Sequence, residues 1–188
     1  MIFGDNNTYT GNTLIFAGTL QSNAASVIPD ISQVILSPGT LWDLNSNTEG
    51  IGSLSGSGNI NLGTTNLSIG GDNLSTTYSG SINGSGIVTK SGTGTLTLSG
   101  SNTWTGSLLL SGGSVKLGAN DVIADLVLVS VVTGTFDLDG NSDTVGSISG
   151  LGTIDLGSGT LTTGNDNTSS TFSGIITGSG GLSKTGSG

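Results

Sequence analysis

The amino-acid sequence predicts an all-β solenoid, in which short parallel strands wind into a stack of turns. Sequence segments recur about 94 residues apart, apolar residues alternate with polar ones at a period of two, and glycine is abundant at the expected corners, with 35 of 188 residues. Long repeats of this kind are typical of solenoids, where each turn buries its apolar side only against its neighbours. No segment shows the sustained apolar period of 3.6 residues that indicates a helix.

The repeat is visible in five pairs of segments, whose first residues lie 95 apart in the first pair and 94 apart in the others. The pairs are Asn7–Gly11 with Asn102–Gly106, Asp43–Asn45 with Asp137–Asp139, Gly52–Gly56 with Gly146–Gly150, Tyr78–Gly80 with Phe172–Gly174, and Lys90–Gly92 with Lys184–Gly186. Because 188 is twice 94, we expect two units, about 1–94 and 95–188, in one continuous solenoid over 1–188 that is cut from a longer array.

Alternation of apolar and polar residues between glycine-rich corners predicts the strands. In the first unit we expect Thr13–Phe16, Thr19–Gln21, Val34–Leu36, Leu41–Leu44, Ile51–Leu54, Ile60–Leu62, Asn66–Ile69, Thr77–Ile82 and Ile87–Thr89. In the second unit we expect Thr95–Leu98, Ser107–Leu110, Ser114–Leu117, Leu126–Val129, Thr135–Leu138, Val145–Ile148, Thr153–Leu156, Thr160–Thr162, Thr171–Ile176 and Leu182–Lys184. With about three strands per turn, each turn takes roughly 20–28 residues and the chain holds about seven to nine turns.

The two units fall out of register where residues 24–37 align with residues 119–132. Pro29 and Pro38 lie in or beside the first segment, whereas the second is rich in β-branched residues. We interpret this region as a strand flanked by a surface loop insertion.

Composition excludes several classes of function. The net charge is −9, with twelve carboxylates against three lysines and no arginine, so a phosphate-binding surface for nucleic acid or anionic membranes is not expected. Cysteine and histidine are absent, which removes the usual ligands of structural zinc. No stretch has the length of a membrane helix, and the N-terminal residues do not form a signal peptide.

One motif identifies a family resemblance. Residues 90–106 read KSGTGTLTLSGSNTWTG and continue to the strand and glycine turn at 107–118. This resembles the autotransporter-associated β-strand repeat of passenger domains in bacterial type V secretion, with Trp104 where tyrosine is usual and Ser114-Val115 where Thr-Leu is usual. A second copy runs from residue 3 to residue 20, and a third begins at Lys184.

The resemblance implies a right-handed, single-stranded parallel β-helix that is exported through an outer-membrane barrel and displayed at the bacterial cell surface. Such a chain would meet the membrane only through a barrel domain absent from this sequence. Family members are commonly adhesins or surface-coat proteins, so the expected partners are host-cell or extracellular surface ligands, or neighbouring copies of the chain itself. No cofactor is expected.

The strongest candidate for a metal site is the acidic run at 137–143. Its side-chain oxygens come from Asp137, Asp139, Asn141 and Asp143, which alternate along the chain as calcium ligands do in some loops. Ser142 and Ile148 stand where a calcium loop of the EF-hand type would have glycine and glutamate, and aspartate-glycine runs are common in turns. We therefore predict no metal, with calcium at these four residues as the weaker alternative.

No catalytic residues are predicted, because a serine or threonine nucleophile has no histidine to act as its base. The aromatic residues at 9, 42, 78, 104, 136 and 172 occupy equivalent repeat positions, and they either stack on one outer face that binds sugars or packs against a lateral partner, or cover a turn or a corner. Three functions stay open: a structural and adhesive surface stalk that serves as an autotransporter passenger, a self-assembling coat or filament protein, and a carbohydrate-active β-helix enzyme that uses Asp137 and Asp139.

Overall fold

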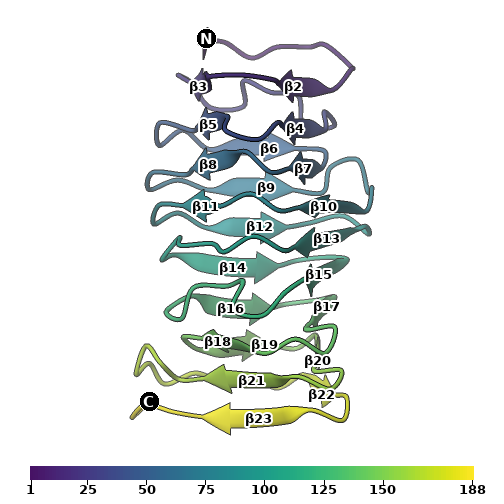
Figure 1. Cartoon of the computed structure of the whole chain (residues 1–188), viewed down its shortest axis with the longest axis vertical. Helices are drawn as coiled ribbons and strands as arrows, with labels where there is room; N and C mark the ends of the chain where they lie inside the picture. The colour runs from purple at the N-terminus through teal and green to yellow at the C-terminus, as the bar shows by residue number, and fades with distance from the viewer.

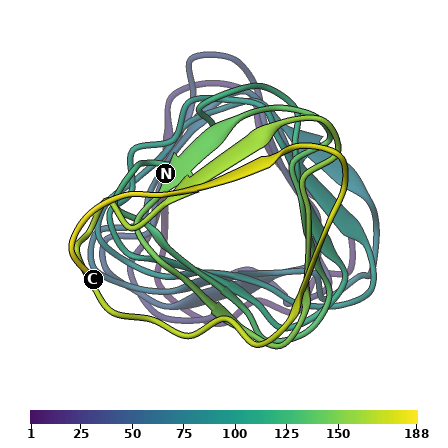
Figure 2. The same cartoon turned by 90° about the horizontal axis from the view of Figure 1, so that it is seen from below.

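The computed structural model describes all residues from Met1 to Gly188 as a straight stack of turns. Its 23 strands pair only in parallel, and no helix is present. The N-terminus lies at one end of the stack and the C-terminus at the other (Figure 1). Seen along the stack, each turn has three sides (Figure 2). The predicted all-β parallel solenoid is confirmed.

Each of the three sides is a flat face of stacked strands. Face 1 is the nine-stranded sheet β2 (Thr13–Ile15), β4 (Val34–Leu36), β7 (Leu54–Gly56), β10 (Thr76–Tyr78), β13 (Thr95–Leu98), β15 (Ser114–Leu117), β17 (Thr135–Asp137), β20 (Thr153–Asp155) and β22 (Ile175–Thr177). Face 3 is the six-stranded sheet β6 (Glu49–Ile51), β9 (Leu67–Ile69), β12 (Val88–Lys90), β14 (Ser107–Leu110), β16 (Leu128–Val131) and β19 (Ile148–Gly150).

Face 2 is divided into two sheets. The first contains β1 (Ile2–Phe3), β3 (Thr19–Ser22), β5 (Leu41–Asp43), β8 (Asn59–Asn61) and β11 (Ile82–Asn83), and the second contains β18 (Asp143–Val145), β21 (Thr160–Thr163) and β23 (Gly181–Lys184). Two coil segments continue the stack between them, because Thr103 N donates to Ile82 O (2.9 Å) and Asp121 N donates to Ser142 O (3.0 Å).

The turns lie at or below the short end of the predicted range of residues per turn. Paired residues on adjacent turns are separated by 18 residues at Phe136 and Ile154 and by 22 residues at Ile60 and Ile82. Nine turns result, as the nine strands of face 1 show.

Most predicted strands are present, but four of them are wrong because they run across a corner. Residues 51–54, 77–82, 145–148 and 171–176 were each expected as one strand, whereas the chain bends at Gly52, Gly80, Gly146 and Gly174. A Cβ atom at Gly52 or Gly146 would lie 2.6 Å from a carbonyl oxygen of the turn before it, so the corner requires the absence of a side chain. Apolar alternation continues through the bend and hides it from sequence inspection.

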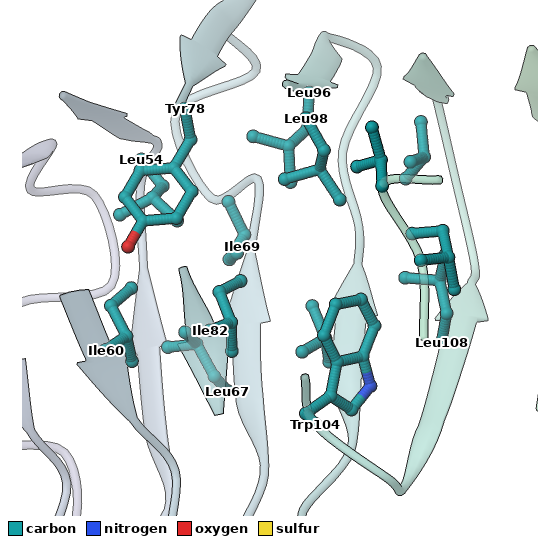
Figure 3. Close-up of a cluster of buried hydrophobic side chains, with 14 of the residues drawn as sticks. Leu54, Ile60, Leu67, Ile69, Tyr78, Ile82, Leu96, Leu98, Trp104 and Leu108 are labelled. Atoms are coloured by element: carbon teal, nitrogen blue, oxygen red, sulfur yellow. The ribbon is translucent and has the colours of Figure 1, made fainter. Parts of the chain in front are cut away.

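The interior is a single column of apolar side chains. Leucine, isoleucine and valine alternate inward along every face, and Tyr78 and Trp104 lie fully buried among them (Figure 3). Trp42 and Phe136 are also fully buried. The outer sugar-binding stack is therefore wrong for these four aromatic residues, which serve the core instead.

In the region where the units lose register, the predicted strand is present in each unit as β4 and β16, but the flanking segment is not a surface insertion. Val27 and Ile28 in the first unit, and Val122 and Ile123 in the second, are at most 2 % exposed and belong to the core. The backbone of these segments is not in a strand conformation, although the side chains lie in the core. Something other than a neighbouring strand must therefore satisfy their backbone amides.

Candidate functional site

The most elaborate polar arrangement in the chain supports the coil segments of face 2. Asn102 accepts a hydrogen bond from Ile82 N at Oδ1 (2.9 Å) and donates from Nδ2 to Val122 O (3.0 Å). On the next turn, Val122 N and Ile123 N both donate to Asp143 Oδ2, at 2.8 and 3.1 Å. We call Asn102, Val122, Ile123 and Asp143 the second polar column, since these residues link successive turns where strand pairing is interrupted.

The first unit contains the same arrangement 94 to 95 residues earlier, but on face 3. Asn7 Nδ2 donates to Val27 O (2.7 Å), and Glu49 accepts from Val27 N at Oε2 (3.2 Å) and from Ile28 N at Oε1 (2.8 Å). We call Asn7, Val27, Ile28 and Glu49 the first polar column. The asparagine and the acid of each column are side-chain substitutes for the missing strand.

Burial of the two carboxyl groups dominates their electrostatics. Desolvation raises the pKa of Glu49 to about 7, against the opposing effect of the amides of Ile28 and Val27. Desolvation likewise raises the pKa of Asp143 to about 6, with Ile123 and Val122 opposing. The nearby carboxylates of Asp30 and Asp121 add to the respective increases. No cation pairs with either group, since the one salt bridge of the chain joins Lys116 and Asp139.

The lysine of the motif also binds backbone groups of the solenoid. Lys90 is 1 % exposed, and its Nζ donates to the carbonyl oxygens of Ser91 and Gly92. Burial lowers the pKa of Lys90, and the charge of Asp72 opposes this decrease. The ammonium group thus binds the carbonyl oxygens of its own corner and is not available to a ligand.

The four calcium candidates do not converge. Asp137 accepts from Asp139 N (2.8 Å), and Asp139 forms the exposed ion pair with Lys116 Nζ (2.9 Å). Asn141 donates from Nδ2 to Leu117 O (2.9 Å), while Asp143 is buried in the second polar column. Nowhere in the chain do three acidic side chains gather in a group that could hold a metal ion. Calcium binding by these residues is a sequence prediction to which the geometry adds no support.

Hollows are found only at the two ends of the stack. One is lined mainly by apolar residues of the first two turns, including Phe3, Leu14 and Phe16. The other is lined by Phe172, Leu182, Lys184 and small polar residues of the last turns. No Asp or Glu side chain lines either hollow, and Lys184 Nζ donates to the carbonyl oxygens of Thr185 and Gly186.

Sequence inspection missed the role of Glu49 entirely and assigned Asp143 to a turn or a metal. A usable signal was present, because Glu49 and Asp143 are equivalent acids at the 94-residue spacing. Each follows the asparagine of its Asn-Thr-aromatic-Thr-Gly motif by about two turns.

Comparison with known proteins agrees with the motif. The family described as the passenger-associated transport repeat matches residues 1–21 and 88–117, which contain the asparagine of each polar column. The adhesin BmaC autotransporter of Brucella suis biovar 1 (strain 1330) is 37 % identical over 206 residues, which cover 98 % of this chain. The chain spans 6 % of the length of that protein.

No solved structure matches the chain. It contains no helix that is long and apolar enough to cross a membrane. The matched segments contain the motif lysine and both asparagines, whose side chains support the corners and coil segments of the solenoid. On this combination of motif, structure and similarity, the chain carries the passenger repeat of autotransporters.

Proposed function

We propose that this chain is a stiff segment of an adhesive passenger stalk, displayed at the bacterial cell surface and tethered to the outer membrane through its parent protein. The observation that carries the proposal is the 37 % identity to an autotransporter adhesin over 98 % of the chain. The partners would be molecules on a host cell or in the extracellular matrix.

The physical character of the solenoid supports a role as a stalk. Its 36 core residues form one continuous cluster from Ile15 to Leu161, so bending the rod requires separating packed turns. The outer surface has few charges, with three lysines and twelve carboxylates, and presents mainly hydroxyl and amide groups. Such a rod extends a contact surface away from the membrane and offers no enclosed site for a small substrate.

Adhesion can be tested with the purified chain coupled to fluorescent beads. We expect these beads to bind cultured epithelial cells more than beads carrying a variant with Gly86→Val. A Cβ at Gly86 would lie 1.6 Å from Thr65 O, so this variant cannot keep the stack intact. Equal binding by both kinds of beads would contradict an adhesive role for the folded surface.

The two alternatives have their own readouts. A coat or filament protein forms ordered lattices or fibres from purified material, which electron microscopy detects. A carbohydrate-active enzyme using Asp137 and Asp139 cleaves polysaccharides, and Asp139→Ala abolishes the cleavage. The geometry does not favour the enzyme, because Asp139 is paired with Lys116 and the hollows lie at the ends of the stack.

A further inference from the structure

The two units of the chain meet at two strand pairs. β10 pairs with β13, with Tyr78 opposite Leu98, and β12 pairs with β14, with Lys90 opposite Leu110. The last strands of the first unit are thereby joined to the first strands of the second unit. We call these two strand pairs the internal joint.

The two ends of the chain each repeat one half of the internal joint. At the C-terminal end, residues 170–172 and 182–184 lie 94 residues after those of β10 and β12. At the N-terminal end, the residues of β1 and β2 lie 95 residues before their equivalents in β13 and β14, and the pairing of β1 with β3 repeats that of β13 with β15 residue for residue. The chain therefore carries both halves of one contact, at opposite ends of the stack (Figure 1).

Side chains that are buried in the internal joint are open at the ends of the chain. Leu96 and Val88 are at most 1 % exposed in the joint, whereas their equivalents Met1 and Leu182 are 80 % and 51 % exposed. The two hollows of the chain are lined by residues of these same end turns. Each end thus presents an apolar surface that is covered wherever its equivalent occurs inside the chain.

A side-chain acceptor of the motif also lacks its donor at the N-terminal end. In the internal joint, Asn102 Oδ1 accepts a hydrogen bond from Ile82 N (2.9 Å). Its equivalent Asn7 donates from Nδ2 to Val27 O (2.7 Å) but accepts no hydrogen bond at Oδ1. The equivalent of Ile82 is Ile176, which lies in β22, the last strand of face 1. The matching donor is therefore at the opposite end of the chain.

The strands at the two ends lack the features that usually prevent edge pairing. β1, β2, β22 and β23 each pair on one side only, and Lys184 is the only charged residue among them. No helix covers them. Soluble proteins commonly protect such edges with charged residues, proline or a covering segment.

We propose that the C-terminal end of one copy of this chain binds the N-terminal end of a second copy, head to tail, in the register of the internal joint. In that register residues 182–184 pair with residues 13–15 of the second copy, and Ile176 N donates to Asn7 Oδ1 of the second copy. Only Thr95 of the internal joint has no equivalent in this contact. The carboxylate of Gly188 and the ammonium group of Met1 then face one another across a gap of one residue, about 7 Å between their Cα atoms, and their charges are complementary.

The winding of the strands agrees with this contact. The last two strands are β22 on face 1 and β23 on face 2, so the next strand position lies on face 3. β1 of the second copy occupies that position, its motif coil follows on face 1, and its β2 lies on β23. The second copy therefore continues the stack without a skipped position, turned by one face. Because the two surfaces in contact are different, each added copy leaves a free end, and open rows of copies form instead of a closed dimer.

The absence of cysteine makes a cross-linking test direct. The variant carries Leu14→Cys and Ser183→Cys, at exposed positions whose equivalents Leu109 and Thr89 pair in the internal joint. Neighbouring residues in paired strands have the Cα separation that a disulfide requires. The two cysteines lie at opposite ends of one chain, so they can join only different copies. We expect a ladder of oligomers on a non-reducing gel, whereas each single variant stays monomeric.

A second double variant, Leu14→Cys with Thr177→Cys, is the control for the register. Thr177 is exposed at the same end of the stack, but it lies on face 1 and not beside residue 14 of the second copy. We expect no ladder from this variant. A ladder as strong as that of the first variant would overturn the register, and the absence of a ladder from the first variant, or equally abundant dimers of a single variant, would overturn the head-to-tail contact.

Association without cross-links is measured by analytical ultracentrifugation of the complete chain. We expect the average mass of the unchanged chain to rise with concentration. Leu182→Lys places a charge in the contact and should weaken association about tenfold or more. The matched control is Leu151→Lys, at an exposed leucine between β19 and β20 that lies outside the contact. An unchanged chain that is monomeric at every concentration, or equal weakening by both substitutions, would contradict the proposal. These readouts do not depend on the adhesive function, because no host-cell ligand is present.

Discussion

Both polar columns supply hydrogen-bond acceptors to backbone amides that have no neighbouring strand. The acceptors come from acids of different length. Glu49 reaches two amides with two separate oxygens, at 3.2 and 2.8 Å. Asp143 is one methylene shorter and accepts both amides at Oδ2, which leaves its Oδ1 buried with no hydrogen-bond partner. The repeat therefore preserves an acceptor at this position, not a fixed acceptor geometry.

This difference separates the two roles of a buried carboxyl group. As an acceptor it satisfies two orphan amides, which is favourable in both columns. As a charge it loses hydration, which is unfavourable in both and raises both pKa values. The acceptor role explains why a side chain with an acceptor oxygen lies at this position, and the cost of the charge predicts how each column responds to substitution and to pH.

Removing the acceptor should have the largest effect. Glu49→Ala leaves two buried amides without a partner and opens a cavity, and we expect a loss of about 3–5 kcal/mol in unfolding free energy. Asp143→Ala should cost about 1 kcal/mol less, because it also removes the unpaired Oδ1. Urea denaturation measures both values. A larger loss for Asp143→Ala would show that the unpaired oxygen is not a cost.

The second-largest effect should be the dependence of the unfolding free energy on pH. Both carboxyl groups have a higher pKa in the folded state than in the unfolded state. The contribution of each group to the unfolding free energy is therefore fully present below its unfolded pKa, and it is lost as the pH rises through the folded pKa. For Glu49 this window runs from 4.5 to about 7, and for Asp143 from 3.8 to about 6. We expect the melting temperature to rise as pH is lowered from 8 to 5, with Glu49 contributing on the order of 3 kcal/mol.

Glu49→Gln is the control for this pH effect, because its side chain cannot titrate; it keeps only one of the two acceptor oxygens, so its stability should be lower at every pH. The melting temperature of Glu49→Gln should vary less between pH 5 and pH 8 than that of the unchanged chain. The remaining variation should lie below pH 6, where Asp143 titrates. An unchanged profile would show that Glu49 is not the group that titrates.

Exchanging the two acids should have smaller effects, and the two exchanges should change the unfolding free energy in opposite directions. Glu49→Asp shortens the reach to Val27 N and Ile28 N, and we expect a loss of about 1–2 kcal/mol. Asp143→Glu places a second oxygen near Val122 N and Ile123 N, and we expect a gain of up to about 1 kcal/mol. Thermal unfolding of the two variants checks the signs. A loss in both would indicate that each site is packed to fit its own side chain.

Sequence inspection predicted the fold because its signals are local. The alternation of apolar and polar residues and the glycine corners determine each strand from its own residues. Stacking of the turns then places equivalent strands in the same way. At Gly52 and Gly146 the prediction failed because alternation passes through a corner unchanged, and the need for glycine depends on a carbonyl oxygen of the preceding turn.

The polar columns were missed in the sequence because their partners lie about 20 residues apart, on adjacent turns. Asp143 lies beside Asp137 and Asp139 in the sequence, so it resembles part of an acidic loop, yet it points into the core toward Val122 and Ile123. Its equivalent Glu49 has fewer acidic neighbours, and comparing the two would have separated the buried acid from the exposed ones.

That comparison also predicts the smallest effect, the response to calcium. Of the four candidate ligands, Asp143 is committed to the core, and Asn141 is held by the bond from its Nδ2 to Leu117 O, so at most Asp137, Asp139 and Asn141 Oδ1 could reach an ion. Three residues fall short of the six to eight oxygens that calcium prefers. We expect millimolar calcium to change the melting temperature by less than about 1 °C, with magnesium as the control for ionic strength. A rise of several degrees with calcium alone, lost in Asp137→Asn, would show instead that the second unit gains a metal site that Asp43 and its neighbours in the first unit lack.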